Sequence, residues 1–393
     1  MRQTGINKYH VVSLVIAWAV IHGILFWHFG IRTLYDSADY VKHAAFLIEH
    51  GKFEDTDQLF YAMPILFIAF SRWLFAQQLL PFLIFQIALS GIAVLALYRS
   101  AEKVFNNAWA GFLSGIIFLV WWDNIHWNIT VMTESFFCSF TCFIVYLLVH
   151  FKGSRREHYI IFAFLTIIFF ARPTGIIITL GVIAFLLHYH WRFLAANAVR
   201  KVSLIAGLLL MAYFSASLMF IQWDFTEQYR KGNIVTHMDT IEGSTLYEES
   251  LRLNTNDLEF APDNSPAVVK IVYFIINNPR HFLMTASLKV WYLVSGIRPY
   301  YSTVHNSFTL VWMTAVYFFC YNGWRNSSAA LINTFNLTVI VADCGLIAIS
   351  TVDWDNRFYI PMEPSIVLLA GGGAMTLIEL LKKKIAESSE PGI

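Results

Sequence analysis

Charged residues are scarce in this chain, and their scarcity excludes most soluble architectures. Asp, Glu, Lys and Arg make up 13% of its 393 residues, while hydrophobic residues make up 57%. A soluble domain carries about 25% charged residues, so this composition predicts a polytopic membrane protein. The 27 basic residues nearly balance the 26 acidic ones. Without a basic excess we expect no nucleic-acid partner.

Cysteine is also rare, and its placement excludes a disulfide framework. The four cysteines, Cys138, Cys142, Cys320 and Cys344, all fall in apolar stretches. Cys138 and Cys142 share a helix face, where core packing is the better interpretation because two thiols buried in lipid make a poor metal site. A cleavable signal peptide is not predicted either, since no small-residue cleavage site follows residues 11–29.

Long apolar stretches are what the chain has in abundance. A span takes roughly 20 apolar residues, and about ten stretches qualify. We predict an all-α bundle with spans at 10–29, 79–98, 108–123, 133–151, 158–171, 174–190, 202–222, 306–323, 329–350 and 361–381. No internal repeat is evident, so residues 1–393 are expected to form a single integral membrane domain.

The basic residues orient these spans, because Lys and Arg collect in cytoplasmic connections. They occur in alternate connections, at Arg2 and Lys8, Arg99 and Lys103, Lys152 to Arg156, Arg192 to Lys201, Arg325, and Lys382 to Lys384. Both termini are therefore expected in the cytoplasm. The small size favours a bacterial plasma membrane, whose outer side is the periplasm or the cell exterior.

The outer side then receives the unusual segments, above all the loops 30–78 and 223–305, the second of which precedes the last three spans. We expect Leu59–Phe75 and Phe282–Ile297 to lie in the interface, because a spanning helix at either place would put the later basic clusters outside. Residues 224–266 are polar and contain helix breakers, which predicts an irregular loop.

Ionisable side chains gather in these outer segments, close to the hydrocarbon boundary. Such groups are costly there and indicate function. They are Asp36, Asp39, His43, Asp123, His126, Glu134, Arg172, Arg298, His305, Asp353, Asp355 and Arg357. Several have simpler explanations. Asp353 and Asp355 could pair with Arg357, Arg172 could extend to the interface, and Asp343 within the ninth span could hydrogen bond to a neighbouring helix.

An ordered set of short motifs resembles a known family. The set comprises Asp36 followed by Tyr40, His50-Gly-Lys-Phe53, Pro64, Thr133-Glu134, Ala171-Arg-Pro173, Asn278-Pro279 and Arg357-Phe-Tyr-Ile-Pro361. In order and spacing, residues 10–380 resemble the GT-C fold glycosyltransferases, and among them the dolichyl-phosphate-mannose-protein-mannosyltransferase-like enzymes that use polyprenyl-phosphate sugars. Each motif alone is weak, and the ordered set carries the resemblance.

The resemblance implies an essential acid in the first outer loop and a second acid in the next one. Asp36 matches the first position, and Glu134 matches the second, with Asp123 left open as an alternative. The chain departs from better-known relatives in having Ser37 directly after Asp36, no DxD motif in the second loop and no large C-terminal soluble domain. Metal dependence therefore stays open, with Asp36 and Glu134 as ligands if a divalent ion is bound.

The expected activity is a hexosyl or pentosyl transfer from a polyprenyl-phosphate sugar to a glycan, lipid or protein acceptor on the outer face. Asp36 is expected to be the general base and Glu134 its partner, with inversion because one direct displacement needs no covalent intermediate. The expected substrate-binding residues are Asp39, His43, Asp123, Arg172, Arg298, His305 and Arg357. Arg357 is favoured for the leaving phosphate, since guanidinium groups bind phosphate bidentately.

Two other functions stay open. A transporter or flippase would suit Asp343, but the chain lacks the repeats and interrupted helix pairs that are typical of such folds. A lipid-linked oligosaccharide polymerase or ligase would place arginines in a large mid-chain outer loop, and Arg252, Arg280 and Arg298 fit that pattern. A membrane scaffold gives no reason for acids and arginines to collect on one side.

Overall fold

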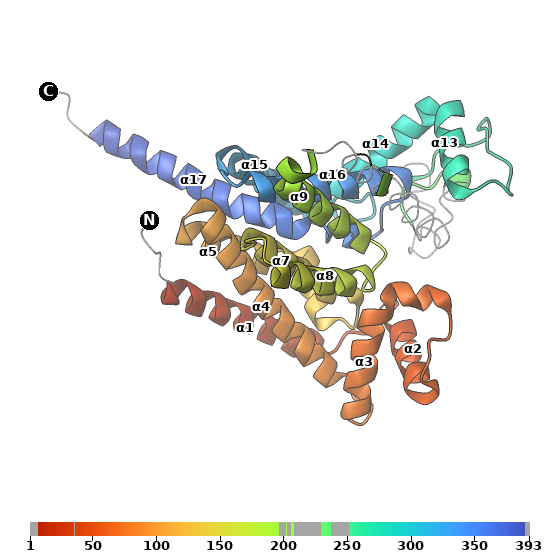
Figure 1. Cartoon of the computed structure of the whole chain (residues 1–393), viewed down its shortest axis with the longest axis horizontal. Helices are drawn as coiled ribbons and strands as arrows, with labels where there is room; N and C mark the ends of the chain where they lie inside the picture. Colours follow the sequence, from red (N-terminus) through yellow and green to blue (C-terminus); the bar gives the residue numbers. More distant parts are fainter. Residues whose placement is uncertain are drawn as a thin grey trace. The chain divides into compact units, whose positions relative to one another are not determined.

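A computed structural model describes residues 7–34, 36–195, 202, 206–207, 229–236 and 251–389 (Figure 1). Helices dominate these residues, where β-pairing is limited to three isolated bridges, Arg32 with Thr130, Asn233 with Arg252, and Val235 with Val352. The all-α class expected from the composition is confirmed for this part of the chain. The expected span at 202–222 lies almost entirely outside the described residues.

The chain divides into two compact units. Unit 1 comprises residues 1–185, 315–339 and 360–393, and unit 2 comprises residues 186–314 and 340–359. In chain order the helices are α1 (Lys8–Phe29), α2 (Ser37–His50), η1 (Thr56–Tyr61), α3 (Ala62–Leu74), α4 (Leu80–Phe105), α5 (Ala108–Val120), α6 (Trp122–Ile125), η2 (His126–Ile129), α7 (Thr133–Val149), α8 (Arg155–Phe169), α9 (Gly175–Ala195), α13 (Ala267–Asn277), α14 (Pro279–Ser295), α15 (Thr303–Asn326), α16 (Ala330–Ile349), η5 (Arg357–Tyr359) and α17 (Glu363–Ser389).

Local sequence explains where several helices begin and end. Asn7 and Asn107 accept hydrogen bonds from the first-turn amides of α1 and α5, and Ser154 forms a reciprocal capping box with Glu157 at the start of α8. Gly51 ends α2 in the left-handed conformation that favours glycine. Each expected span outside 202–222 falls on a helix, although α4 and α17 continue beyond the expected ends at residues 98 and 381, to Phe105 and Ser389.

Among the described residues, four helices are long and apolar enough to cross a membrane, namely α1, α4, α16 and α17. A fifth span results if the bent pair 108–120 and 122–129 counts as one. These apolar helices indicate an integral membrane protein. The expected count of about ten is not confirmed, because α7 and α9 contribute shorter apolar stretches and a full span takes roughly 20 residues.

The core of unit 1 is packed around α4, α5, α7 and α17. Large aromatic side chains such as Tyr98, Trp127 and Phe137 are fully buried in it. A glycine run in α17 allows close approach of neighbouring backbones: a Cβ atom at Gly373 would overlap the carbonyl oxygen of Phe319 on α15. Small residues commonly set such close helix contacts in membrane bundles.

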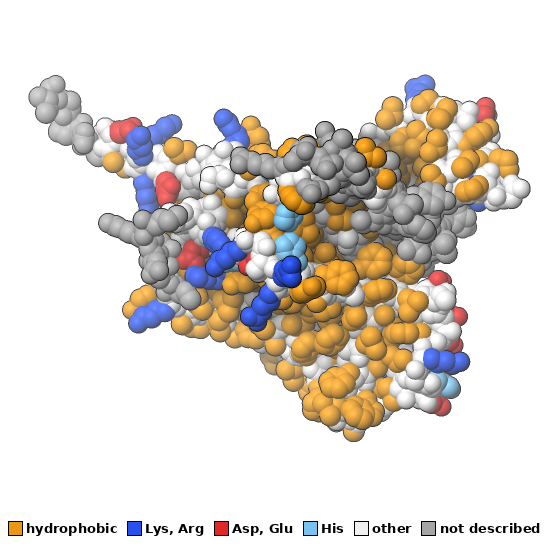
Figure 2. Space-filling model, viewed as in Figure 1, with side chains coloured by type: hydrophobic (Ala, Val, Ile, Leu, Met, Phe, Trp, Pro, Cys, Tyr) orange, Lys and Arg blue, Asp and Glu red, His pale blue; other side chains and the backbone are white. Residues whose placement is uncertain are grey.

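The first loop forms a helical hairpin of α2 and α3. Thirteen residues of α3 reach only about 20 Å at 1.5 Å per residue, which is shorter than the hydrocarbon core of a bilayer. Hydrophobic side chains gather over α3 at the bottom of Figure 2, where Phe70, Trp73 and Leu74 are exposed. This length and this exposed face support the expectation that Leu59–Phe75 lies in the interface and does not cross it.

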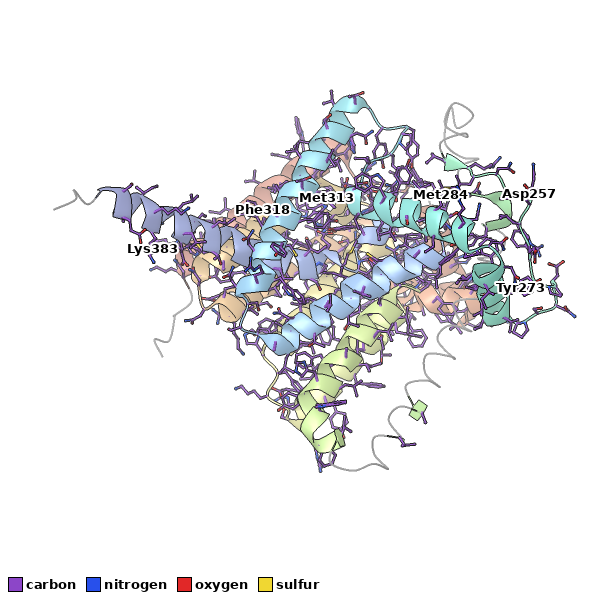
Figure 3. All side chains as sticks on the ribbon, turned by 90° about the horizontal axis from the view of Figure 1, so that it is seen from above. Asp257, Tyr273, Met284, Met313, Phe318 and Lys383 are labelled. Atoms are coloured by element: carbon purple, nitrogen blue, oxygen red, sulfur yellow. The ribbon has the colours of Figure 1, made fainter. Side chains whose placement is uncertain are left out.

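In unit 2, two buried side chains donate hydrogen bonds to the C-terminal end of α16 and to the residue that follows it. The hydroxyl of Tyr229 donates to the carbonyl of Ala348 at 2.7 Å, and the buried ammonium of Lys289 donates to the carbonyl of Ser350. The Lys289 Nζ atom also lies 3.8 Å from the centre of the Tyr229 ring. Helices α13 and α14 expose apolar side chains, among them Tyr273 and Met284 (Figure 3).

Candidate active site

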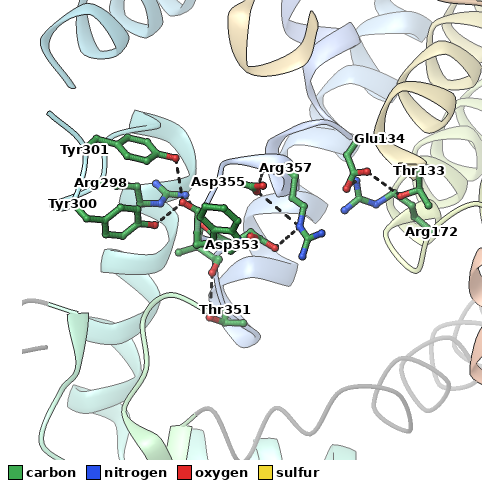
Figure 4. Close-up of polar contacts among 12 residues, drawn as sticks. Thr133, Glu134, Arg172, Arg298, Tyr300, Tyr301, Thr351, Asp353, Asp355 and Arg357 are labelled. Atoms are coloured by element: carbon green, nitrogen blue, oxygen red, sulfur yellow. Dashed lines mark hydrogen bonds and ion pairs between the residues drawn. The ribbon is translucent and has the colours of Figure 1, made fainter. Parts of the chain in front are cut away.

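A buried ion pair lies at the head of α7 in unit 1. The Oε1 atom of Glu134 lies 2.9 Å from Nη1 of Arg172, and the hydroxyl of Thr133 donates to Oε2 at 3.2 Å (Figure 4). Glu134 is in the first turn of α7, where the helix dipole favours a negative charge. The side chains of both partners are almost inaccessible to water. Arg172 is therefore paired inside the protein, and the expectation that it merely extends to the interface is wrong.

The backbone around Arg172 is shaped to present this side chain. Arg172 and Pro173 connect α8 to α9, and the amide of Gly175 donates to the carbonyl of Arg172 at 2.9 Å. A side chain at Gly175 would overlap the carbonyl of Ile168, so the turn requires glycine. The interruption of an apolar run by Arg-Pro in the sequence coincides with this tight turn.

Asp36 and Tyr40 complete the cluster from α2. Tyr40 is buried, and burial raises the pKa of its hydroxyl well above the usual value; Tyr61, Glu134 and Asp36 raise it further, while Arg172 lowers it. The charges of Glu134, Asp36 and Arg172 thus all act on one buried hydroxyl. The two acids expected to carry the chemistry share this electrostatic effect on Tyr40.

Sequence reasoning gave Tyr40 no role of its own. A usable signal existed, because Tyr40 follows Asp36 by four residues and so falls on the same face of α2, one turn further along. The amide of Tyr40 donates to the carbonyl of Asp36 at 3.0 Å, which fixes this spacing. A protonated phenol can donate a hydrogen bond to a carboxylate or to a bound substrate.

A backbone contact joins the segment that carries Asp36 to the turn that precedes Glu134. The amide of Arg32 donates to the carbonyl of Ile129 at 3.0 Å, and the amide of Val131 donates back to the carbonyl of Arg32 at 2.9 Å. This short bridge explains how residues of two different loops reach the same place.

The other acids and the histidine predicted for this side of unit 1 lie elsewhere. Asp39 is exposed on α2. His43 contacts its own loop, with Nδ1 2.8 Å from Nε2 of Gln58 and 3.5 Å from a carboxylate oxygen of Glu54. Asp123 is half-buried in α6, where its charge acts on the buried Glu363 at the start of α17.

A second cluster of charges belongs to unit 2 and follows α16. The Nε atom of Arg357 lies 2.6 Å from Oδ2 of Asp353 and 3.9 Å from Oδ1 of Asp355 (Figure 4). The pairing of Asp353 and Asp355 with Arg357, weighed from the sequence as the simpler interpretation, is therefore present. The terminal nitrogens of Arg357 point away from the two acids in Figure 4.

Arg298 stabilises the backbone of unit 2. Its guanidinium is buried and donates to the carbonyls of Tyr292 at 2.7 Å, Ile297 at 2.8 Å and Asp353 at 2.7 Å. These contacts favour a structural role over the expected phosphate contact. The ring of His305, in the first turn of α15, lies against Tyr301 with 4.5 Å between ring centres.

A metal site does not emerge from this geometry. Within the described residues, no group of three or more His, Cys, Asp or Glu side chains could hold a metal ion. The Glu134 carboxylate already has the Arg172 charge beside it. Two carboxylates with a guanidinium beside one of them make a poor ligand set for a divalent ion, which usually takes six or more oxygen ligands.

Comparison with known proteins supports the resemblance noted in the sequence. The family model of the dolichyl-phosphate-mannose-protein mannosyltransferases matches residues 62–220. No curated protein matches the chain. A solved structure of similar fold is the archaeal oligosaccharyltransferase AglB from Archaeoglobus fulgidus, in complex with an inhibitory peptide and a dolichol-phosphate.

That similarity has a TM-score of 0.51 at 13% sequence identity and covers 99% of this chain but 53% of the AglB chain. The present chain thus spans about half the length of AglB, and at this identity the likeness shows the fold alone. The predicted resemblance is confirmed: residues 62–220 match the dolichyl-phosphate-mannose-protein mannosyltransferase family, and the chain has a GT-C-like fold.

Proposed function

We propose that this protein is a membrane glycosyltransferase that moves a sugar from a polyprenyl-phosphate donor to an acceptor on the outer face of the membrane. The observation that carries the proposal is the buried ion pair of Glu134 with Arg172, whose charges act together with that of Asp36 on the buried hydroxyl of Tyr40. The family match over residues 62–220 supports the same donor class, as does the dolichol-phosphate bound to the structurally similar AglB.

Asp36 is the proposed general base. The acceptor hydroxyl attacks the anomeric carbon of the sugar, its proton passes to the Asp36 carboxylate, and the bond between the anomeric carbon and the phosphate oxygen breaks. Free polyprenyl phosphate leaves with the bonding electron pair. One displacement of this kind inverts the anomeric configuration. Asp36 suits the role because it is half-buried at the start of α2, accessible to a substrate yet partly shielded from water.

Glu134 is the proposed partner of Asp36 in preference to Asp123. Its charge is compensated by Arg172, so the pair can persist away from water without a metal. Held at the head of α7, Glu134 raises the negative potential at the hydroxyl of Tyr40, and this hydroxyl is proposed to donate a hydrogen bond to the base or to the acceptor. A direct role for Arg172 in phosphate binding is less well supported, because its guanidinium is already committed to Glu134.

The developing charge on the leaving phosphate needs a cation, and Arg357 is the arginine proposed for it. Asp353 fixes its Nε atom and thereby orients the guanidinium fork. A preorganised donor of this type is commonly worth several kcal/mol to a transition state. His305 and Asp39 are kept as substrate-binding candidates. The loop 223–305, part of which lies outside the described residues, is proposed from its length and polarity to select the acceptor.

The cellular setting follows from the same proposal. An outer-face site in a bacterial plasma membrane would use undecaprenyl phosphate as its carrier lipid, with both termini in the cytoplasm. The donor tail remains in the bilayer while its head group reaches the acids.

The test measures the release of free polyprenyl phosphate by the purified protein from a panel of polyprenyl-phosphate sugars, with membrane extract as the source of acceptor. We expect release by the wild type and about a 100-fold to 10,000-fold lower rate for Asp36→Asn, because general-base catalysis contributes about 10²–10⁴-fold. Asp57→Asn is the matched control, since Asp57 is an exposed acid of the same loop. Full activity of Asp36→Asn would refute the base assignment.

A further inference from the structure

A buried histidine of α1 lies in a hydrogen-bonded network that none of the reaction steps above uses. His22 is 3% exposed, and its Nδ1 atom lies 2.8 Å from the carbonyl oxygen of Trp18. A carbonyl can only accept, so Nδ1 carries the proton and, in the neutral ring, Nε2 carries the lone pair. That lone pair accepts a hydrogen bond from Nδ2 of Asn128 at 2.9 Å.

Asn128 connects this histidine to the first turn of α7. The side-chain oxygen of Asn128 accepts a hydrogen bond from the hydroxyl of Ser135, the residue that follows Glu134. Asn128 is 4% exposed and Ser135 is 1% exposed. His22, Asn128 and Ser135 thus form a directional chain from α1 to the residue beside Glu134, which we name the His22 network.

Two further contacts fix the turn that carries Asn128. On α4, the Nε2 atom of Gln86 donates to the carbonyls of Trp127, Asn128 and Thr130 at 2.9, 3.3 and 2.8 Å. The backbone bridge between Arg32 and residues 129–131 attaches the same turn to the segment that leads into Asp36. The turn at residues 127–131 is therefore linked on one side to the segment before Asp36 and on the other side, through Ser135, to the helix turn that carries Glu134. On α1, the side chain that holds this turn is His22.

Polar side chains inside apolar helices are costly, and a packing role alone would be met by apolar residues. A fully paired network also fixes one arrangement of the groups it joins. We propose that His22 is a positioning residue: through Asn128 and Ser135 it holds the head of α7, and with it Glu134, in the orientation that the reaction requires. The proposal rests on the function proposed above and adds a residue to it.

The polarity of the network makes the proposal specific. His22 must offer an acceptor at Nε2, because Nδ2 of Asn128 can only donate. An apolar side chain at position 22 leaves that amide donor buried without its acceptor. The side chain of Asn128 then lowers its free energy by rotating to form a hydrogen bond with another group. Ser135 then loses its acceptor, and the first turn of α7 loses its restraint.

The experiment compares His22→Leu with His22→Gln in the proposed sugar-transfer assay on the full-length protein. We expect His22→Leu to lower kcat about 10-fold to 100-fold, the effect of a misplacement of about 1 Å, with KM for the polyprenyl-phosphate sugar changed less than about 2-fold. His22→Gln should recover most of kcat, because its amide oxygen can accept from Asn128. A merely structural role would lower the yield of folded protein and would leave kcat per folded molecule unchanged.

His10→Leu is the matched control. His10 is also buried on α1, but its ring packs on Trp109 and Phe112 and lies outside the His22 network. Its replacement should leave kcat unchanged. If His22→Leu does not fold, Ser135→Ala breaks the last link by removing one atom and should lower kcat similarly, with Ser139→Ala one turn further along α7 as its control.

An unchanged kcat in both His22→Leu and Ser135→Ala would overturn the proposal, as would an equal loss in His10→Leu. Amide hydrogen exchange over residues 126–135 separates this failure from a failure of the proposed function. If the wild type transfers sugar from no donor, the proposed function is refuted, and hydrogen exchange alone then tests whether the His22 network holds the head of α7. Faster exchange in His22→Leu but not in His10→Leu supports it, and unchanged exchange overturns it.

Discussion

Removing the charge of Glu134 should destabilise the protein more than removing the charge of Arg172. In Glu134→Gln the Arg172 guanidinium keeps its charge but loses its anion, and it is left facing the ring of Phe137, 6.0 Å from the ring centre. In Arg172→Gln the Glu134 carboxylate keeps the hydroxyl of Thr133 at 3.2 Å and the N-terminus of α7. The carboxylate thus has partial compensation that the guanidinium lacks.

The magnitude follows from burial. The exposed fractions of the two side chains are 6% and 1%, so the value for a broken buried pair applies, about 3–5 kcal/mol. A surface pair would give about 0–1 kcal/mol. The remaining contacts of Glu134 are worth about 1.5–3 kcal/mol for a hydrogen bond to a charged group and up to about 1 kcal/mol for the helix end. We therefore expect about 4 kcal/mol for Glu134→Gln and about 2 kcal/mol for Arg172→Gln.

The assay is a double-mutant cycle of unfolding free energies, measured by titration with a denaturing detergent. The double variant removes both charges and should cost at least about 2 kcal/mol less than the sum of the single variants. Thr141→Ala is a suitable control for a buried polar residue of the same helix, because its hydroxyl donates to the carbonyl of Phe137 within the helix. Additive single effects would refute the buried pair, and a larger loss in Arg172→Gln would refute its asymmetry.

Two further predictions concern stability. Burial lowers the pKa of Lys289 to about 7, so between about pH 7 and 10.5 the unfolded chain binds more protons than the folded protein and the free energy of unfolding rises with pH. Lys289→Met should reduce this rise by a few kcal/mol in unfolding titrations at pH 7 and 9. An equal pH dependence in both proteins would contradict the lowered pKa. Gly373→Ala should lower the unfolding temperature measurably, because its Cβ would overlap the carbonyl of Phe319. Gly345→Ala is the control: nothing lies within 4 Å of its Cβ position, so the unfolding temperature should stay unchanged or rise slightly. Equal shifts in the two variants would argue against the close α15–α17 contact.

The helices of the described chain were largely predictable from sequence. Their apolar stretches, asparagine and serine caps and the glycine after His50 act within a few residues of each other, and local interactions of that range are present in the sequence itself. The resemblance to the mannosyltransferases was readable for a similar reason, because it rests on short motifs in a fixed order. The number of spans was less readable, since hydropathy does not separate a short buried helix from a crossing one.

The sequence predicted which residues belong to the candidate site better than it predicted which of them pair with each other. Asp36 and Glu134 were expected together, and the charges of both act on the buried hydroxyl of Tyr40. The sequence could not pair Glu134 with Arg172, nor assign Arg298 to backbone carbonyls, because an arginine in an outer loop looks the same whether it meets a phosphate, a carboxylate or a carbonyl.

The sequence by itself determined the membrane-embedded helical class, most helix bounds and the acids to examine. Only the tertiary structure decided which charges are neutralised, that Tyr40 lies among them, and that His22 of α1 reaches the head of α7 through Asn128. The physical reason is that helix formation depends on neighbours along the chain, whereas ion pairs and buried hydrogen bonds depend on which distant segments packing brings within about 3 Å.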